Sequence, residues 1–332
     1  MRIAFRRKED GAELIRVWSE SEVVKVPENV GKYRINSIAS YAFSNHKQVE
    51  DEDVEFFEED SRAEEFQMQD LPLRCGANLL EIHLPPTVKV IGNYAFYGCM
   101  NMKVFHGTDE IVRMGSGVFT GCRLSNVQID FYEGERSCLK EILTEIRYEI
   151  VATLVYGKGK EERFTKIIFP EHYMDAVENT PARIVETHYY GSGGEYRECF
   201  YRRELDYLKY DRMFALSGVR DDEAVTVQVA LARLMYPVKL EDAARRRYET
   251  YIREHLTNLI KDCLKKLDDH ENYALGSPVE IVEFICRMEY FERDVLERAI
   301  DLASRTGQTE VLSILMDERH RRFPVRKKKF VL

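Results

Sequence analysis

The segment IGNYAFYGCMNM, residues Ile91–Met102, is followed by a near copy, MGSGVFTGCRLSNV, which begins at Met114. Phe96 and Phe119 occupy the same place in the two copies, at a spacing of 23 residues. The cysteines at 99 and 122 keep that spacing. Repetition with a period in the twenties is typical of a solenoid, in which successive turns of chain stack on one another. We therefore expect Phe96 and Phe119 to lie in adjacent turns and to pack ring against ring.

Each turn of such a solenoid contains a short strand, whose alternate side chains point to opposite faces. Three segments have this character: LLEIHL (79–84), MKVFHG (102–107) and LSNVQI (124–129). Within them Ile82, Phe105 and Val127 recur at spacings of 23 and 22 residues and are expected to point inward. One turn cannot bury its apolar side alone, so neighbouring turns must cover it.

The remaining side chains of these strands should form a strip on the open, concave face, and they are our candidates for binding a protein partner. They are Glu81, His83, Val104, His106, Asn126 and Gln128. His83 and His106 lie one repeat apart, so we expect them to stack at about the 5 Å spacing of neighbouring strands. No third ligand is evident beside this pair, and we predict neither a metal ion nor a cofactor.

The phrase LPPTVKVIGNYAFYGCMNM, residues 84–102, resembles the BspA-type leucine-rich repeat, whose pattern reads approximately I-x-L-P-x-x-V-x-x-I-G-x-x-A-F-x-x-C-x-x-L. The likeness covers about residues 22–130 and includes an earlier copy, INSIASYAFSNHK, which lacks the Gly-Cys pair. The resemblance implies a solenoid binding surface and no catalytic residues. Many proteins of that family are secreted or surface-bound adhesins of bacteria, so one alternative is a surface or effector protein exported without a cleavable signal.

An acidic insert separates the first copy from the second. The phenylalanines of these copies are 53 residues apart, which is one repeat plus 30 residues, and the excess covers about residues 48–77. From Glu50 to Glu65 there are ten acidic residues and a single arginine. The simpler interpretation is a solvated loop excluded from the solenoid. The other is a docking segment in which Phe56, Phe57 and Phe66 are apolar anchors.

Residues 137–217 are expected to connect the solenoid to the rest of the chain. The stretch SCLKEILTEIRYEI has helical spacing and is predicted to cap the last repeat. VATLVY and RFTKIIFP flank a Gly-rich turn and predict a β-hairpin. The remainder is rich in tyrosine and arginine, which are enriched in binding hot spots. Tyr196 and Arg197 are our candidates there for contacting a partner.

An enzyme or nucleotide-binding regulator, the other alternative, would have its site in residues 171–217. The backbone N–H groups of Gly191–Gly194 can cradle a phosphate, but the segment lacks a P-loop lysine and a strand-then-helix signature. Cys199 and His188 can be paired as a nucleophile and its base, but no flanking motif supports them. We therefore predict no catalytic residues.

Residues 218–332 are predicted to be helical. The segment AIDLASRTGQTEVLSILMDER resembles the two-helix core of an ankyrin repeat, with Gly307 at the tight turn, and the likeness covers about residues 278–320. It implies a helical-repeat surface. Seven Lys or Arg residues between Arg319 and Lys329 form a basic tail. It can bind nucleic acid or an anionic membrane, pair with the acidic insert of this chain or of a neighbour, or be a solvated charged terminus.

Composition excludes several function classes. The 332-residue chain is 44% hydrophobic and 32% charged, which is typical of a globular protein. Its net charge of −9 makes nucleic acid an unlikely partner. Seven cysteines form no Cys-x-x-Cys pair. No apolar run reaches the roughly 18 residues of a transmembrane segment and the N-terminus has no signal-peptide pattern, so we expect a cytoplasmic protein.

The predicted architecture is of the α+β class. A short leucine-rich-repeat solenoid occupies residues 1–136, a connector with a β-hairpin residues 137–217, and a mainly α-helical, repeat-like domain residues 218–332. The predicted function is that of a non-enzymatic protein–protein interaction scaffold or adaptor of a bacterial cytoplasm. It would bind through the concave face of the solenoid and through the helical domain.

Overall fold

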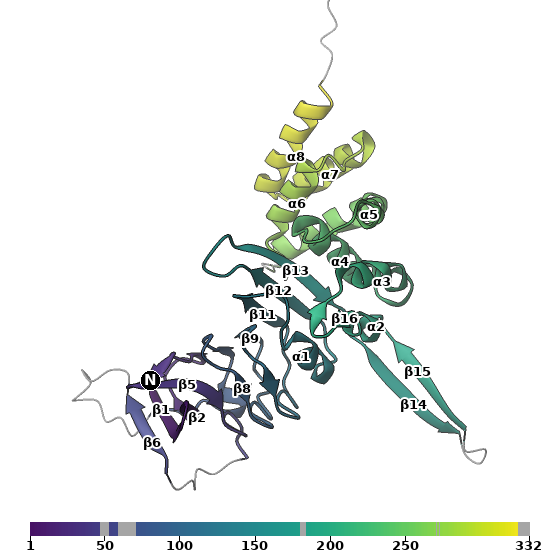
Figure 1. The fold of residues 1–332 in the computed structure, drawn as a ribbon. Helices are drawn as coiled ribbons and strands as arrows, with labels where there is room; N and C mark the ends of the chain where they lie inside the picture. Colours follow the sequence, from purple (N-terminus) through teal and green to yellow (C-terminus); the bar gives the residue numbers. More distant parts are fainter. Residues whose placement is uncertain (47–52, 59–70, 180–183, 270, 272, 325–332) are drawn as a thin grey trace, which may run out of the picture. The chain divides into compact units, whose positions relative to one another are not determined.

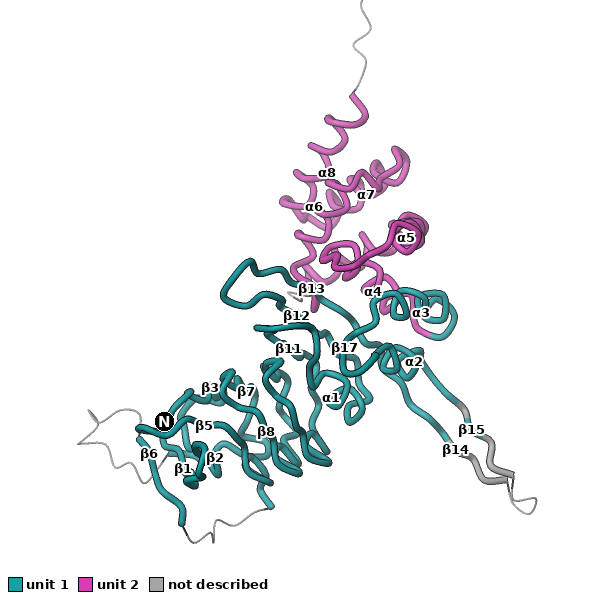
Figure 2. The backbone as a smooth tube through the Cα atoms, viewed as in Figure 1, with its two compact units in different colours: residues 1–220 teal, residues 221–332 magenta. Residues whose placement is uncertain are grey.

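A computed structural model describes residues 1–46, 53–58, 71–179, 184–269, 271 and 273–324. The chain forms two compact units, Met1–Arg220 and Asp221–Leu332 (Figure 1, Figure 2). The amino-terminal part of the first is a β-solenoid of about five turns, and the second is helical, which gives an α+β fold.

Two sheets form the sides of the solenoid. The first contains β1 (Arg2–Lys8), β2 (Gly11–Trp18), β4 (Asn29–Val30), β5 (Tyr33–Ile38), β6 (Glu55–Glu58), β8 (Val90–Ile91) and β10 (Arg113–Met114). The second contains β3 (Val23–Lys25), β7 (Glu81–His83), β9 (Val104–Thr108), β11 (Asn126–Phe131), β12 (Ile150–Tyr156) and β13 (Arg163–Phe169). The strand orders are β10-β8-β5-β2-β1-β6, with β4 paired to β5, and β13-β12-β11-β9-β7-β3. The chain therefore alternates between the sheets as it winds.

Aromatic rings stack along the interior of the solenoid. The ring centroids of Phe43 and Phe96 are 5.1 Å apart and those of Phe96 and Phe119 are 5.4 Å apart. All three side chains are fully buried. The stacking of Phe96 on Phe119 confirms the register predicted from the repeat. On the second sheet the same register places Ile82 of β7 beside Phe105 of β9.

The small residues of the repeat lie where turns approach one another most closely. Cys99 and Cys122 are buried, and each thiol donates to the backbone carbonyl of the stacked phenylalanine one turn back. At Gly92 an added Cβ would lie 2.4 Å from the backbone nitrogen of Ser40 in the preceding turn. Only glycine lets the backbones meet at that distance.

The first turn is covered by a β-hairpin that precedes the repeats. β1 pairs antiparallel with β2, and β2 pairs parallel with β5, so the hairpin extends the first sheet. Arg16 on β2 is fully buried, and its Nη1 lies 2.8 Å from the carbonyl oxygens of Tyr41, Ala42 and Ser44. The guanidinium therefore satisfies carbonyls of the turn that precedes the acidic insert.

Part of the acidic insert is a strand and not the excluded loop that we expected. β6, which carries Phe56 and Phe57, pairs antiparallel with β1 at the edge of the first sheet. Phe56 is half exposed, but its ring packs against Trp18 and beneath the guanidinium of Arg2. The remaining insert residues, 47–52 and 59–70, lie outside the described residues, as does the end of the basic tail after Pro324.

A helix covers the other end of the repeats, as predicted. In α1 (Leu139–Glu145) the carboxylate of Glu145 accepts hydrogen bonds from the backbone N–H groups of Val118 and Phe119. The predicted hairpin is also confirmed, because β12 and β13 pair antiparallel. β12 in turn pairs parallel with β11. The second sheet therefore continues through the segment that we had assigned to a separate connector.

The rest of the first unit contains β14 (Tyr173–Asn179), β15 (Ile184–Tyr190), α2 (Gly193–Arg197), β16 (Phe200–Tyr201), β17 (Glu204–Leu205) and α3 (Tyr207–Arg220). Among the described strands, β14 and β15 pair only with each other.

The second unit contains α4 (Glu223–Met235), α5 (Asp242–Asp268), α6 (Pro278–Arg287), α7 (Arg293–Arg305) and α8 (Thr309–Arg322). Between α7 and α8 lies Gly307, whose φ of +72° suits the predicted tight turn, while Ala303 and Val311 are fully buried. The helix–turn–helix is therefore present, although nothing in it is specific to ankyrin. None of the described helices is both long and apolar enough to span a bilayer.

Candidate functional site: a polar strip on the second sheet

The outward-facing positions of β7, β9 and β11 lie side by side. The strand register places Glu81 beside Val104 and Asn126, and His83 beside His106 and Gln128. The residues between these positions point into the core, because adjacent residues of a strand point to opposite faces. The predicted register of the six candidates is confirmed, and their contact with a partner stays a prediction.

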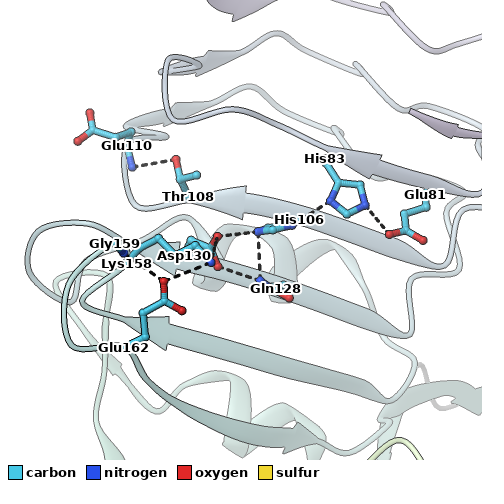
Figure 3. Close-up of polar contacts among 10 residues, drawn as sticks. All are labelled: Glu81, His83, His106, Thr108, Glu110, Gln128, Asp130, Lys158, Gly159 and Glu162. Atoms are coloured by element: carbon cyan, nitrogen blue, oxygen red, sulfur yellow. Dashed lines mark hydrogen bonds and ion pairs between the residues drawn. The ribbon is translucent and has the colours of Figure 1, made fainter. Parts of the chain in front are cut away.

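The two histidines are the centre of a hydrogen-bonded chain across the strands (Figure 3). Their ring centroids are 5.0 Å apart, and the two Nδ1 atoms are separated by 3.0 Å. His83 Nε2 lies 2.5 Å from Glu81 Oε1. His106 Nε2 lies 3.0 Å from Asp130 Oδ2. Each imidazole thus has one nitrogen against a carboxylate and the other against its neighbour.

Asp130 extends this chain beyond the residues predicted from the sequence. Gln128 Nε2 donates to Asp130 Oδ1 at 2.8 Å, and Lys158 Nζ lies 3.4 Å from Asp130 Oδ2. Burial alone would raise the pKa of Asp130, but the hydrogen bonds from His106 and Gln128 and the charge of Lys158 together hold its pKa below the usual value. Asp130 is therefore ionised at neutral pH.

We call the set Glu81, His83, His106, Gln128, Asp130 and Lys158 the polar strip. Its two histidine side chains are 27% and 22% exposed, while that of Asp130 is 5% exposed. The strip therefore presents imidazole edges to solvent and keeps a buried carboxylate beneath them. A signal for Asp130 was present in the sequence, because it follows Gln128 by two residues and so lies on the same face of β11.

Tyr196 and Arg197 are not on the surface, so our expectation that they contact a partner is corrected. Both are buried, with exposures of 0% and 5%. The Arg197 guanidinium donates to the backbone carbonyls of Leu143, Ile146, Tyr148, Pro170 and Gly193. Burial lowers the pKa of Arg197 to about 10, so its guanidinium is still charged at neutral pH. The side chain therefore ties α2 to the segments around it.

Exposed aromatic residues of the same region lie on the β14–β15 ribbon. The members of this set, which we call the aromatic patch, are Tyr173 (45% exposed), Met174 (50%), Tyr189 (68%) and Tyr190 (43%). Tyr173 and Tyr190 stack with ring centroids 4.3 Å apart. A hollow of about 560 Å³ adjoins the patch and is also lined by Leu143 and Met213. Sequence reasoning identified the tyrosine-rich segment but not its exposed members.

Two of the residues considered for an enzyme, Gly193 and Cys199, lie in closely packed surroundings. At Gly193 an added Cβ would lie 2.0 Å from the Pro170 carbonyl oxygen, so this turn is packed against backbone. Cys199 is fully buried, and burial raises the pKa of its thiol to about 12, which keeps it protonated. The side chain of His188 lies outside the described residues. Within the described part of the chain, no cluster of three or more His, Cys, Asp or Glu residues has the geometry of a metal site.

Comparison with known proteins identifies one part of the chain. No curated protein and no solved structure is significantly similar to the chain. No family match confirms the ankyrin-like repeat. The family model described as BspA type Leucine rich repeat region (6 copies) matches residues 74–146, which include the polar strip up to Asp130. Residues 74–146 are thus a BspA-type leucine-rich-repeat region.

Proposed function

We propose that the chain is a non-enzymatic scaffold or adaptor of a bacterial cytoplasm, which binds a protein partner through the outward face of β7, β9 and β11. Leucine-rich repeats generally mediate protein–protein interactions. The observation that carries the proposal is the polar strip, which crosses three neighbouring strands without a break.

The strip has the properties of a pre-organised binding surface. Its side chains are held by one another, so a partner would not have to immobilise them, and the entropic cost of ordering side chains at an interface is reduced. Val104 and Asn126 lie beside it on the same face. The buried phenylalanine stack behind the strands keeps them in register.

The aromatic patch supports a second contact surface on the first unit. Tyrosine and methionine are enriched in the cores of protein interfaces, and contiguous exposed apolar side chains are uncommon on surfaces without a binding role. The helical domain is included in the proposal by analogy with other helical arrays, which bind partners through their extended surfaces.

The test uses two valines of the same repeat. Val104→Arg places a long charged side chain on the proposed binding face, whereas Val112→Arg introduces the same charge at a side chain that is 61% exposed and lies outside that face. Both variants and the wild type are used as bait in extracts of the source cells, and captured proteins are quantified by mass spectrometry. The proposal requires at least one protein captured by the wild type and Val112→Arg but lost with Val104→Arg.

Equal capture by both variants would refute the proposed face. Fluorescence of Trp18 provides the fold control, because it is the only tryptophan and lies on β2 of the same unit. Cell fractionation checks the cytoplasmic location independently of binding, and recovery of the chain in the medium or on the cell surface would contradict it.

A further inference from the structure

The protons of the polar strip can be assigned from its geometry. His83 Nε2 faces the Glu81 carboxylate and His106 Nε2 faces the Asp130 carboxylate, at 2.5 and 3.0 Å. A carboxylate is an acceptor only, so each Nε2 must carry the hydrogen. Gln128 Nε2 also approaches His106 Nε2 at 3.2 Å. That contact is not a hydrogen bond in this arrangement, because both nitrogens carry hydrogen and the amide donates to Asp130.

This assignment leaves both Nδ1 atoms without hydrogen, with their lone pairs open to the gap between the two rings. They are 3.0 Å apart, which is the distance of a hydrogen bond. Two neutral imidazoles in these tautomers would have no hydrogen between the Nδ1 atoms. A metal ion bound to both Nδ1 atoms would place a positive charge next to these two lone pairs.

We propose that His83 and His106 form a binding site for a divalent transition metal ion of the Ni²⁺ and Cu²⁺ type, with the two Nδ1 atoms as ligands. Imidazole nitrogen is a preferred ligand of these ions, and Cu²⁺ binds it most tightly of the first-row divalent metals. The site lies within the polar strip, and its existence does not depend on whether the strip also binds a protein.

The separation of the ligand atoms favours this class of ion. With metal–nitrogen bonds of about 2.0–2.1 Å, two nitrogens 3.0 Å apart subtend roughly 94° at the metal. That is close to the right angle between neighbouring ligands of a square-planar or octahedral ion. A tetrahedral Zn²⁺ ion would instead need the two nitrogens to be roughly 3.3 Å apart.

Two carboxylates lie behind the proposed histidine ligands, on the side away from the metal. Histidine ligands usually donate their second N–H to a carboxylate, which fixes the tautomer and orients the ring. Glu81 and Asp130 have this relation to His83 and His106. Their two negative charges also favour a divalent cation. The partial exposure of both rings leaves the remaining coordination positions to water.

In the test, the full chain is titrated with Ni²⁺ in a non-chelating buffer, and binding is measured by isothermal titration calorimetry. We expect one equivalent of metal to bind to the wild type, and this step to be lost in His83→Gln and in His106→Gln. Glu81→Gln, which keeps both ligands but weakens the orienting hydrogen bond, should lower the affinity by about 10–100-fold. His46→Gln and His255→Gln, which alter histidines outside the strip, should bind as the wild type does.

A second measurement does not depend on any variant. The electron paramagnetic resonance spectrum of the chain with one equivalent of Cu²⁺ should show coupling to imidazole nitrogens, and substitution of either histidine should change it. The proposal is overturned if the wild type binds no Ni²⁺ at millimolar metal. It is equally overturned if binding persists unchanged in His83→Gln and His106→Gln.

Discussion

The aromatic stack inside the solenoid can be tested by the substitution Phe96→Ala. Phe96 lies between Phe43 and Phe119, with centroid separations of 5.1 and 5.4 Å, and its side chain is fully buried. Truncation of a buried phenylalanine to alanine costs about 3–5 kcal/mol. Each stacked pair adds about 0.5–1.5 kcal/mol. Because Phe96 belongs to two such pairs, we expect a loss near the upper end of the first range.

This loss would be a large part of the stability of the unit, because domains unfold with only about 5–15 kcal/mol. Each turn of a solenoid is stabilised mainly by its neighbours, so a defect in the middle turn also weakens the turns on both sides of it. The expected phenotype is a fold that unfolds at clearly lower denaturant concentration than the wild type.

The assay is urea unfolding followed by the fluorescence of Trp18, which reports on the first unit alone because it is the only tryptophan. The matched control is Phe164→Ala on β13, where the ring is 48% exposed and its removal should cost about 0.5 kcal/mol. If Phe96→Ala destabilised the unit by less than about 1 kcal/mol, or by no more than Phe164→Ala, the stacked solenoid core would be refuted.

Three further predictions concern charged and titratable groups. Arg16→Met should lower the free energy of unfolding by roughly 3 kcal/mol in the same assay, because it leaves buried carbonyls without a donor. Arg34→Met, at an exposed position, should lower it by about 0.5 kcal/mol or less. Equal effects of the two substitutions would show that the Arg16 guanidinium contributes nothing to stability. The folded-state pKa of Asp130 lies below its unfolded value, so its contribution to stability is present above pH ~4 and is lost as the pH falls through the folded pKa. Between neutral pH and pH ~3 the free energy of unfolding should therefore fall more for the wild type than for Asp130→Asn. Parallel pH profiles of the two proteins would contradict this. Burial raises the pKa of Cys138, Cys199 and Cys263 to about 12, so alkylation at mildly alkaline pH should modify them only after denaturation, and rapid labelling of the native chain would show that they are accessible.

The solenoid was predictable because its evidence is local and repeated. Phe96 and Phe119 are separated by one repeat length, and equivalent positions of successive repeats stack on one another in a solenoid. The neighbours of a side chain can therefore be found by counting residues. The same reasoning predicted that His83 would lie beside His106. Asp130 was missed only because the alternation along β11 was not followed to its end.

The elements that were missed depend on contacts between distant segments. β6 pairs with β1 across about 50 residues, and its acidic sequence has the composition of a solvated loop. The burial of Arg197 was likewise invisible, because arginine is usually exposed. Only the folded arrangement shows that carbonyls from several segments converge on its guanidinium and offset the cost of removing it from water.

The acidic insert leaves and re-enters the solenoid at neighbouring points. The backbone N–H of Gly76 donates to the carbonyl of Phe43 at 2.9 Å, and the Cys75 thiol donates to Asn45 Oδ1 at 2.7 Å. The turns before and after the insert are therefore joined directly, whatever the length of chain between them. We expect such a junction to tolerate changes in the length of the insert, and it is a natural position for grafting a reporter or a foreign domain without disturbing the stacked turns.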